Sequence, residues 1–293
     1  MNRSKDSSTS LRIAIQKSGR LTEKTTDLLH GIGIDFDNYK RNLMVKTRNF
    51  DVELLLLRDD DIPEYVQDGI CDLGFVGANE VFEKDADVTV LRGLNYGNCR
   101  LSIAAPKKNS IQNVSDFEGK TIATSYPFLT KKYFNRHGIK VNLVEISGAV
   151  EITPQLEVAD AISDLVSTGG TLQANGLEEL FTVLESETKL IQTNLELSPG
   201  KQKLIEKFLV RIDGYQQAAK SRYMMMNAPE DKISAIKEII PSMKSPTIVP
   251  LAESDMVAIH TVIPYTQFWN VMEDLKEAGA SDIVMLPIES MII

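Results

Sequence analysis

Short apolar runs alternate with segments of helical period along the first third of the chain. Apolar runs of strand length occupy residues 11–16, 52–58, 72–76 and 99–105. Residues 21–31 have apolar positions on one helical face and end in glycine, and Pro63 follows three aspartates as it would in a first helical turn. Strands that alternate with helices in this way predict an α/β lobe with a largely parallel sheet.

The same alternation continues from Pro106 and predicts a second α/β lobe. Strands are predicted at residues 121–124, 141–146 and 162–166, extended segments at 181–184 and 189–197, and helices at 127–137, 152–156 and 199–215. We expect the chain to cross back, so that residues 1–105 and 186–218 form one lobe and residues 106–185 the other. Two such lobes imply a cleft, with ligands at the carboxyl ends of the strands.

Residues 219–293 have a different order of elements. Strands are predicted at residues 222–227, 247–251, 256–263 and 281–288, and helices at 230–240 and 265–278. The order is βαββαβ, that of a ferredoxin-like unit. A domain of about 70 residues is marginal alone, so we expect it to pack on another copy or on the lobes.

Composition narrows the possible functions. The 293 residues carry a net charge of −9, which argues against a protein that coats nucleic acid or an anionic membrane, although a small basic pocket remains compatible with it. The apolar runs are far shorter than the roughly 20 residues of a membrane helix. The first ten residues are polar and predicted to be disordered, with no secretory signal, so we expect a cytoplasmic protein.

Few side chains are candidates for a resident metal ion or a disulfide framework. The chain has two cysteines and three widely separated histidines, too few for either. Asp59, Asp60 and Asp61 could hold a metal, but acids in a first helical turn are expected from the helix dipole, and we favour that structural interpretation.

A glycine-rich segment is the strongest candidate for a binding site. The apolar run at residues 162–166 leads into Ser167, Thr168, Gly169, Gly170 and Thr171. Glycines allow a ligand to approach the backbone, and hydroxyls with consecutive N–H groups at a helix start favour phosphate. Asp160 and Asp164 are expected on one face of the strand, where carboxylates suit sugar hydroxyls or a Mg²⁺ carried by the ligand. An ordinary helix-capping turn would have the same composition.

Positive charge follows the first predicted strand. Lys17 and Arg20 flank Gly19 where the first helix begins, a position that normally favours acids. Cations there suggest an anionic ligand in the cleft, although solvated loop charges are about equally compatible with the pattern. Arg48, Arg58 and Arg100 lie near other strand ends and could join the same patch.

The glycine-rich segment and the residues before it resemble a known protein family. Residues 151–172, EITPQLEVADAISDLVSTGGTL, resemble the signature of the ATP phosphoribosyltransferases. The matching positions are Glu151, Ala159, Ile162, Asp164, Thr168, Gly169, Thr171 and Leu172. Glu157 departs from the pattern, because the family usually has glycine there. The stretches LRIAIQKSGRL, LRDDDIPEYVQDGICDLGFVG, NCRLSIA, GKTIATSYP, KSPTIVPL and ASDIVMLPIE resemble the family in its order.

The resemblance implies an α/β fold with a two-lobed, periplasmic-binding-protein-like catalytic region and a C-terminal ferredoxin-like, ACT-like domain, as in the family's long form. It implies transfer of phosphoribosyl from phosphoribosyl pyrophosphate (PRPP) to N1 of ATP, with Mg²⁺ accompanying the pyrophosphate. The segment 167–171 would hold the 5-phosphate, and Asp160 and Asp164 would face the ribose. Lys17, Arg20, Arg48 and Arg100 would meet pyrophosphate and nucleotide phosphates. No residue suggests itself as a general base.

The resemblance also implies regulation and assembly. Histidine would bind the C-terminal domain and inhibit the enzyme, and dimers would assemble into hexamers. We expect Asn227, Ser245 and Thr247 near that effector. The alternative is a two-lobed small-ligand-binding protein without catalytic activity; the absence of a signal peptide, a helix-turn-helix and a basic face argues against receptor and regulator versions of it.

Overall fold

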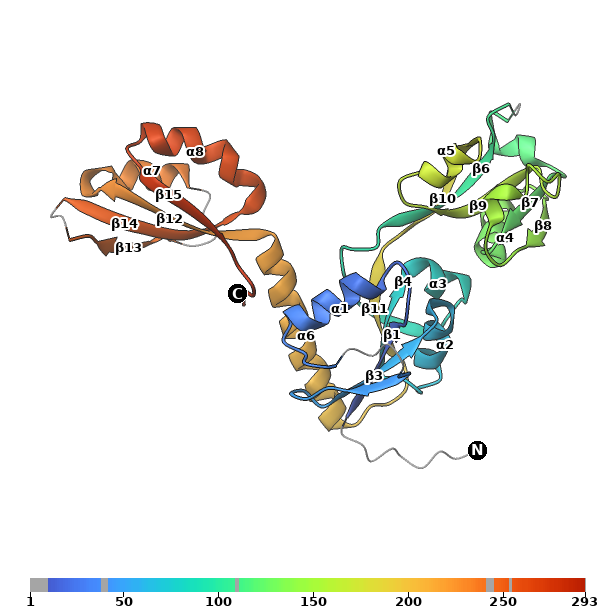
Figure 1. Ribbon diagram of the computed structural model, residues 1–293, viewed down its shortest axis with the longest axis horizontal. Helices are drawn as coiled ribbons and strands as arrows, with labels where there is room; N and C mark the ends of the chain where they lie inside the picture. Colours follow the sequence, from blue (N-terminus) through green and yellow to red (C-terminus); the bar gives the residue numbers. More distant parts are fainter. Residues whose placement is uncertain (1–9, 38–41, 109–110, 241–244, 253–254, 293) are drawn as a thin grey trace. The chain divides into compact units, whose positions relative to one another are not determined.

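The computed structural model of the protein describes residues 10–37, 42–108, 111–240, 245–252 and 255–292. Nine of the ten residues predicted to be disordered, 1–9, lie outside these ranges. Contacts divide the chain into one unit of residues 1–27 and 34–202 and a second unit of residues 28–33 and 203–293 (Figure 1). The first unit contains two sheets, each the centre of an α/β lobe.

The first lobe is built on a six-stranded sheet with the order β2-β3-β1-β4-β11-β5. Its strands are β1 (Leu11–Gln16), β2 (Met44–Lys46), β3 (Val52–Leu57), β4 (Leu73–Gly77), β5 (Val88–Gly93) and β11 (Thr188–Thr193). Its helices are α1 (Thr22–Gly31), η1 (Asp59–Asp61), α2 (Ile62–Gln67) and α3 (Ala78–Glu83). β1 pairs in parallel with β3 and β4, and their continuous apolar runs are buried, as parallel strands covered on both faces require.

The second lobe is built on a five-stranded sheet with the order β10-β6-β9-β7-β8. Its strands are β6 (Cys99–Pro106), β7 (Thr121–Thr124), β8 (Asn142–Glu145), β9 (Ala161–Val166) and β10 (Leu177–Ser186). Its helices are η2 (Val114–Phe117), α4 (Pro127–Arg136), η3 (Val150–Ile152) and α5 (Gly170–Ala174). Phe117 and Phe134 are both buried, with ring centroids 5.4 Å apart, and anchor the core under β7 and β9.

Some sequence-based expectations need correction. Residues 99–105 were expected in the first lobe, but as β6 they pair with β9 and β10 in the second sheet. The helix expected at residues 152–156 is the short η3 followed by turns, in a segment bounded by left-handed residues at Ala149 and Glu157 that leave little length for an α-helix. β2, α3 and β5 had not been expected; each has at most six residues.

The C-terminal unit has the expected βαββαβ order. Its elements are α6 (Pro199–Ala219, which begins in the first unit), β12 (Ser221–Pro229), η4 (Glu230–Lys232), α7 (Ile233–Ile239), β13 (Thr247–Pro250), β14 (Met256–Pro264), η5 (Tyr265–Gln267), α8 (Phe268–Glu277) and β15 (Ser281–Pro287). The antiparallel sheet has the order β13-β14-β12-β15. By contacts, residues from Lys203 onward belong to this unit, earlier than the expected boundary at 219.

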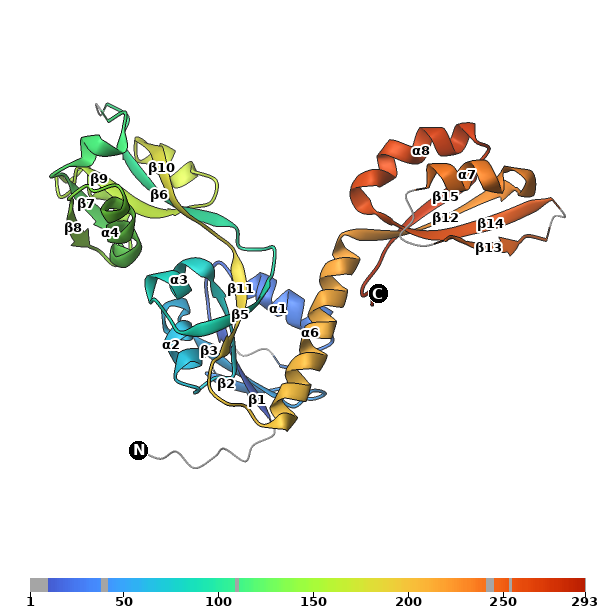
Figure 2. The ribbon, with the colours of Figure 1, turned by 180° about the vertical axis from the view of Figure 1, so that it is seen from behind.

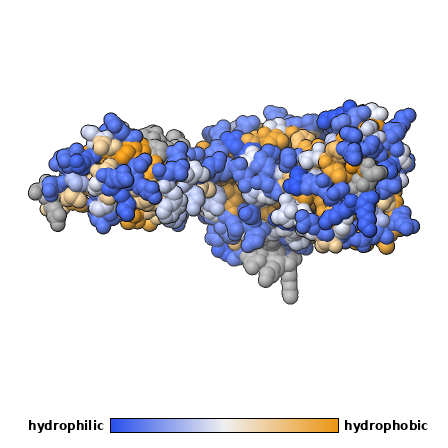
Figure 3. Space-filling model, turned by 90° about the horizontal axis from the view of Figure 1, so that it is seen from above, coloured by the Kyte–Doolittle hydropathy of each residue, from blue (hydrophilic) through white to orange (hydrophobic). Residues whose placement is uncertain are grey.

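One face of this sheet carries the core. Met224 and Met226 of β12 are buried together with Ile236 of α7 and Leu275 of α8, and both ribbon views show the two helices on the same side of the strands (Figures 1 and 2). Several large apolar side chains of the unit remain exposed, Trp269 among them at 70%, and Figure 3 shows hydrophobic residues scattered over a mostly hydrophilic surface. Within the described part of the chain, no helix is both long and apolar enough to span a bilayer.

Candidate functional site

Two short connections between the lobes bring the carboxyl ends of the parallel strands of both lobes to the same region. β5 leads to β6 through residues 94–98, and Glu187 alone separates β10 from β11. β11 begins beside the carboxyl end of β4, since Thr188 pairs with Gly77. β6 begins beside the carboxyl end of β9, since Arg100 pairs with Val166. Loops that follow β1, β3, β4, β7 and β9 therefore converge on the connections, where open α/β sheets bind ligands.

The glycine-rich segment lies at this edge of the second lobe. Gly169 has a φ of +82°, a left-handed conformation that favours glycine, and α5 begins at the next residue. Ser167, Thr168 and Thr171 are exposed, whereas Leu172 is buried and anchors the loop. None of the three hydroxyl groups hydrogen-bonds to another described residue. The loop thus presents hydroxyl and backbone N–H donors to solvent, an arrangement suited to an oxyanion.

Arg100 lies next to this loop, whereas the sequence suggested that it could join the cationic patch after the first strand. Its guanidinium pairs with both carboxylate oxygens of Glu179, and its Nη1 lies 3.5 Å from the Ser167 carbonyl oxygen. The Arg100 guanidinium is the main reason that the pKa of Glu179 is lowered. Arg100 therefore holds the start of the loop while its charge is paired with Glu179.

The first lobe contributes a pocket of about 450 Å³ at its carboxyl edge. Its lining includes Lys17 and Ser18 after β1, and Arg58, Asp59 and Asp61 after β3. Lys17 and Arg58 could meet an anionic ligand there, but Asp59 and Asp61 line the same pocket and the Arg58 guanidinium pairs with Asp60.

The turn after β1 requires its glycine. Gly19 has a φ of +139°, and a Cβ there would lie 2.6 Å from Nε2 of Gln16. The Gln16 side chain in turn accepts a hydrogen bond from the backbone N–H of Leu21. Arg20 extends from this turn and donates to the carbonyl oxygen of Gly97, at 3.1 Å, in the connection between the lobes.

Two expected site residues lie at the amino ends of the parallel strands, opposite the candidate site. Arg48 precedes β3, and it pairs with Asp35 and Asp37. Asp160 precedes β9, and its carboxylate accepts the backbone N–H of Thr121 at 2.8 Å. The six residues of β9 span about 20 Å, so Asp160 is not brought to the glycine loop. The structure does not gather Arg48 and Asp160 with the other candidates.

Asp164 lies near the carboxyl end of β9 and is half-buried. Burial raises the pKa of Asp164, the backbone N–H of Leu165 lowers it, and the charge of Glu151 raises it again. A carboxyl group in this position could accept hydrogen bonds from sugar hydroxyls beside the loop.

Two residues that sequence reasoning missed meet between the lobes. Glu80 of α3 is 7% exposed and accepts hydrogen bonds from the Tyr126 hydroxyl, at 3.0 Å, and from Asn79 Nδ2, at 2.8 Å. Burial is the main cause that raises the pKa of Glu80 to about 7. Both residues lie within three positions after a parallel strand, β4 or β7, and that position was the signal available in the sequence.

The expected effector residues share one sheet face without touching. Thr247 on the edge strand β13 pairs with His260, which pairs with Met225 of β12. Asn227 lies two residues further along β12 and donates to Asp282 at 3.0 Å. Two strand spacings across the sheet and two residues along β12 place Asn227 about 12 Å from Thr247. Ser245 is exposed just before β13.

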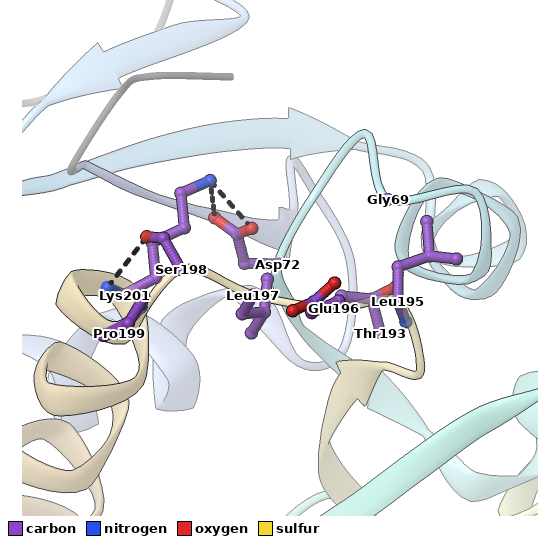
Figure 4. Close-up of a pocket in the computed structure, with 9 residues that line it drawn as sticks. All are labelled: Gly69, Asp72, Thr193, Leu195, Glu196, Leu197, Ser198, Pro199 and Lys201. Carbon is purple, nitrogen blue, oxygen red and sulfur yellow. Dashed lines mark hydrogen bonds and ion pairs between the residues drawn. The ribbon is translucent and has the colours of Figure 1, made fainter. Parts of the chain in front are cut away.

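A further pocket, of about 320 Å³, lies at the amino end of β4 (Figure 4). Its wall contains a buried ion pair in which Lys201 Nζ lies 2.9 and 3.0 Å from the two carboxylate oxygens of Asp72. Asp72 also accepts the backbone N–H of Arg12 at 2.8 Å. The charges satisfy each other, so the pair fastens the start of α6 to the sheet at the edge opposite the candidate site.

Glu157 stands at a position where the family that the sequence resembles usually has glycine. It adopts the left-handed conformation. Its φ is +57°, a region that costs an L side chain about 1–2 kcal/mol. Glu157→Gly is therefore expected to stabilise the lobe by about 1 kcal/mol, which corresponds to a rise in Tm of about 2–4 °C. Differential scanning calorimetry measures this, with Glu145→Gly in strand β8 as the control that should destabilise. An unchanged or lower Tm for Glu157→Gly would contradict the conformational argument.

Models of two protein families match most of the chain. The model described as ATP phosphoribosyltransferase matches residues 58–214, and the model described as HisG, C-terminal domain, matches residues 218–290.

Individual proteins give the same result over nearly the whole length. The ATP phosphoribosyltransferase of Bacteroides thetaiotaomicron is 44% identical over 283 residues, which cover 97% of this chain and 100% of that protein. That of Phocaeicola vulgatus has the same identity and coverage. Among solved structures, the ATP phosphoribosyl transferase (HisG:HisZ) complex from Thermotoga maritima contains a chain that is 28% identical, with a TM-score of 0.60, covering 69% of this chain and 96% of that chain.

Proposed function

This chain belongs to the ATP phosphoribosyltransferase family, pentosyltransferases of histidine biosynthesis, and from that premise we propose that it transfers the 5-phosphoribosyl group of PRPP to N1 of the ATP adenine. The observation that supports the proposal most is the glycine-rich loop at the carboxyl end of β9, with its exposed hydroxyl donors. The loop lies beside the connection to the other lobe, where Lys17 and Arg58 line a pocket together with Asp59 and Asp61.

In the proposed complex the loop binds the 5-phosphate of PRPP. The hydroxyl groups of Ser167, Thr168 and Thr171 and the N–H groups after Gly169 and Gly170 would donate to phosphate oxygens. Asp164, on the strand that leads into the loop, would accept from the ribose hydroxyls. Arg100 would support the loop through Ser167 while Glu179 keeps its charge paired.

The first lobe would bind the more highly charged groups. Lys17 and Arg58 line one pocket, and Arg20 extends from the same turn as Lys17 toward the connection between lobes. In an acidic protein these cations are suited to pyrophosphate and nucleotide phosphates, which carry enough charge to compete with Asp59 and Asp61.

The proposed reaction needs positioning and charge stabilisation more than proton transfer. The lone pair of adenine N1 attacks the anomeric carbon from the face opposite the leaving group, so the configuration inverts. The bond from that carbon to the pyrophosphate oxygen breaks, and its electron pair leaves with pyrophosphate. N1 carries no proton to remove, so no general base is required. Holding two polyanions together and stabilising the leaving group are the tasks of the site.

We propose that Mg²⁺ arrives with PRPP. Mg²⁺ commonly takes its ligands from substrate phosphates, waters and one or two carboxylates. The described residues contain no group of three or more metal-ligating side chains, and Asp164 beside the loop supplies a single carboxyl group. These donors fit a cation held chiefly by the substrate, whose role would be to neutralise charge on the leaving pyrophosphate.

Regulation and assembly complete the proposal. Histidine would inhibit by binding the C-terminal unit near Thr247, Ser245 and Asn227, provided that it binds the inactive arrangement more tightly. The chain would form dimers and hexamers, and it would act in the cytoplasm, where both substrates are made.

The experiment is a coupled analysis of the full-length protein with ATP, PRPP and Mg²⁺. The proposal predicts equimolar pyrophosphate and an ATP adduct heavier by one phosphoribosyl group, attached at N1 by NMR, with a rate that falls as histidine is added. Binding of both ligands without an adduct would instead support a ligand-binding protein and contradict catalysis. A rate that does not change when histidine is added would contradict only the proposed inhibition by histidine.

A further inference from the structure

Side-chain hydrogen bonds join the two lobes of the first unit, in addition to the segments of chain that connect them. Glu80 of α3 accepts a hydrogen bond from Tyr126, which precedes α4 in the other lobe. Asn79 adjoins this contact, since its Nδ2 donates to Glu80 and its side-chain oxygen accepts from Ser186 at 2.8 Å, where β10 leaves the second sheet. The contact is thus connected to both lobes and to a crossing strand.

A second carboxylate of α3 reaches the same helix of the other lobe. Glu83 accepts the backbone N–H groups of Phe128, at 2.8 Å, and Leu129, at 2.9 Å. These groups lie in the first turn of α4, where the helix has no acidic residue of its own. A carboxylate from the other lobe therefore caps the helix, satisfying two N–H groups and the helix dipole.

We propose that Glu80 and Glu83 form a proton-sensitive latch between the lobes, which fastens α3 to α4 when Glu80 is protonated and loosens when it is ionised. The proposal concerns the motion of the lobes and does not depend on the reaction they catalyse.

The charges around Glu80 favour its neutral form while the lobes are in contact. Burial is the largest cause of its raised pKa, and Asp59, Asp60 and Glu83 raise it further, while the Tyr126 hydroxyl lowers it. A neutral carboxyl group keeps a carbonyl oxygen that can accept from Tyr126 and Asn79, so protonation removes charge without removing these hydrogen bonds.

The direction of the pH effect follows from linkage. In the latched state the pKa of Glu80 is about 7, against an ordinary value of 4.5 for an exposed glutamate. A raised pKa means that the latched state binds the proton more tightly, so latching is favoured at low pH and lost as pH rises through 7. The pKa of Glu83 is also raised, chiefly by burial, but its hydrogen bonds from the N–H groups of Leu129 and Phe128 lower it, so the helix cap opposes the effect of burial there. Between pH 5.5 and pH 8.5 the difference for Glu80 corresponds to a fall of roughly thirtyfold in the ratio of latched to open molecules.

The experiment measures the separation of the lobes in the full chain without substrates. Spin labels at Asp68→Cys in the first lobe and Asn135→Cys in the second report on it by double electron–electron resonance. The native Cys71 and Cys99 are buried, and burial raises the pKa of Cys71 to about 12, so they should not take the label. Distances are recorded at pH 5.5 and pH 8.5 for the parent and for Glu80→Gln, Tyr126→Phe and the exposed control Glu64→Gln.

The parent and Glu64→Gln are expected to give one narrow distance at pH 5.5 and a broad or second distribution at pH 8.5. Glu80→Gln, which is neutral at all pH values and still accepts hydrogen bonds, should stay narrow at both. Tyr126→Phe should be broad at both. The latch is refuted if the parent distribution is the same at the two pH values, if Glu80→Gln retains the parent's response, or if Tyr126→Phe behaves as the parent. Because no substrate is present, these outcomes leave the proposed reaction unaffected.

Discussion

Lys201→Met is expected to lower the free energy of unfolding of the first unit by about 3–5 kcal/mol. Lys201 and Asp72 are 9% and 5% exposed as side chains, and their charged atoms lie 2.9 Å apart. Removing the ammonium group leaves a buried carboxylate that keeps a hydrogen bond from the backbone N–H of Arg12 but has lost its counter-charge. The cost of an uncompensated buried charge, rather than the lost attraction, sets the size of the effect.

Urea unfolding of the first unit measures this loss, and two variants isolate its cause. Lys203→Met changes an exposed lysine two residues further along α6 and should alter the stability by less than about 0.5 kcal/mol. Asp72→Asn combined with Lys201→Met removes both charges and keeps an acceptor for Arg12, so it should recover part of the loss. A Lys201→Met variant as stable as Lys203→Met would show that the pair does not fasten α6 to β4.

Thr171→Ala is expected to lower kcat/KM for PRPP by roughly ten- to a hundredfold, because a hydrogen bond to a charged group contributes about 1.5–3 kcal/mol. Thr171 lies in the first turn of α5, and its exposed hydroxyl would donate to the 5-phosphate. ATP would bind on the other lobe, so KM for ATP should change little. Steady-state kinetics with each substrate varied in turn test this, and an equal loss for both substrates would indicate damage to the lobe as a whole.

The strands that carry the site were predictable because they are buried runs of apolar residues. β1, β3, β4, β7 and β9 appear in the sequence as such runs, and each ends in polar residues or glycine. Which sheet a strand joins is decided by its partners far along the chain. β6 was therefore placed in the wrong lobe, since only the pairing of Arg100 with Val166 and Glu185 reveals its sheet.

The same physical rule separates the candidate residues that the structure brings together from those that it does not. Lys17 and the glycine loop follow parallel strands, whereas Arg48 and Asp160 precede them and so lie at the other edge. Closeness to a strand end does not place a residue near the candidate site unless that end is the carboxyl end of a parallel strand. Applied strictly, the rule would also have drawn attention to Glu80 after β4 and Tyr126 after β7.

Pairings between charged side chains could not be predicted from the sequence. Nothing in the local pattern around Arg100 indicates that Glu179 neutralises it, because the two residues are 79 positions apart. The burial that raises the pKa of Glu80 likewise depends on contacts with the other lobe, which no local pattern contains.

Calorimetric titration of the full-length protein with Mg²⁺–PRPP tests the central claim, that the loop after β9 holds the phosphoribosyl donor. The parent and Thr182→Ala, an exposed threonine on β10 of the same sheet, should bind PRPP with equal affinity. Thr171→Ala should bind it roughly ten- to a hundredfold more weakly. If Thr171→Ala binds PRPP as tightly as the parent while remaining folded, the loop does not hold the donor phosphate and the account is wrong.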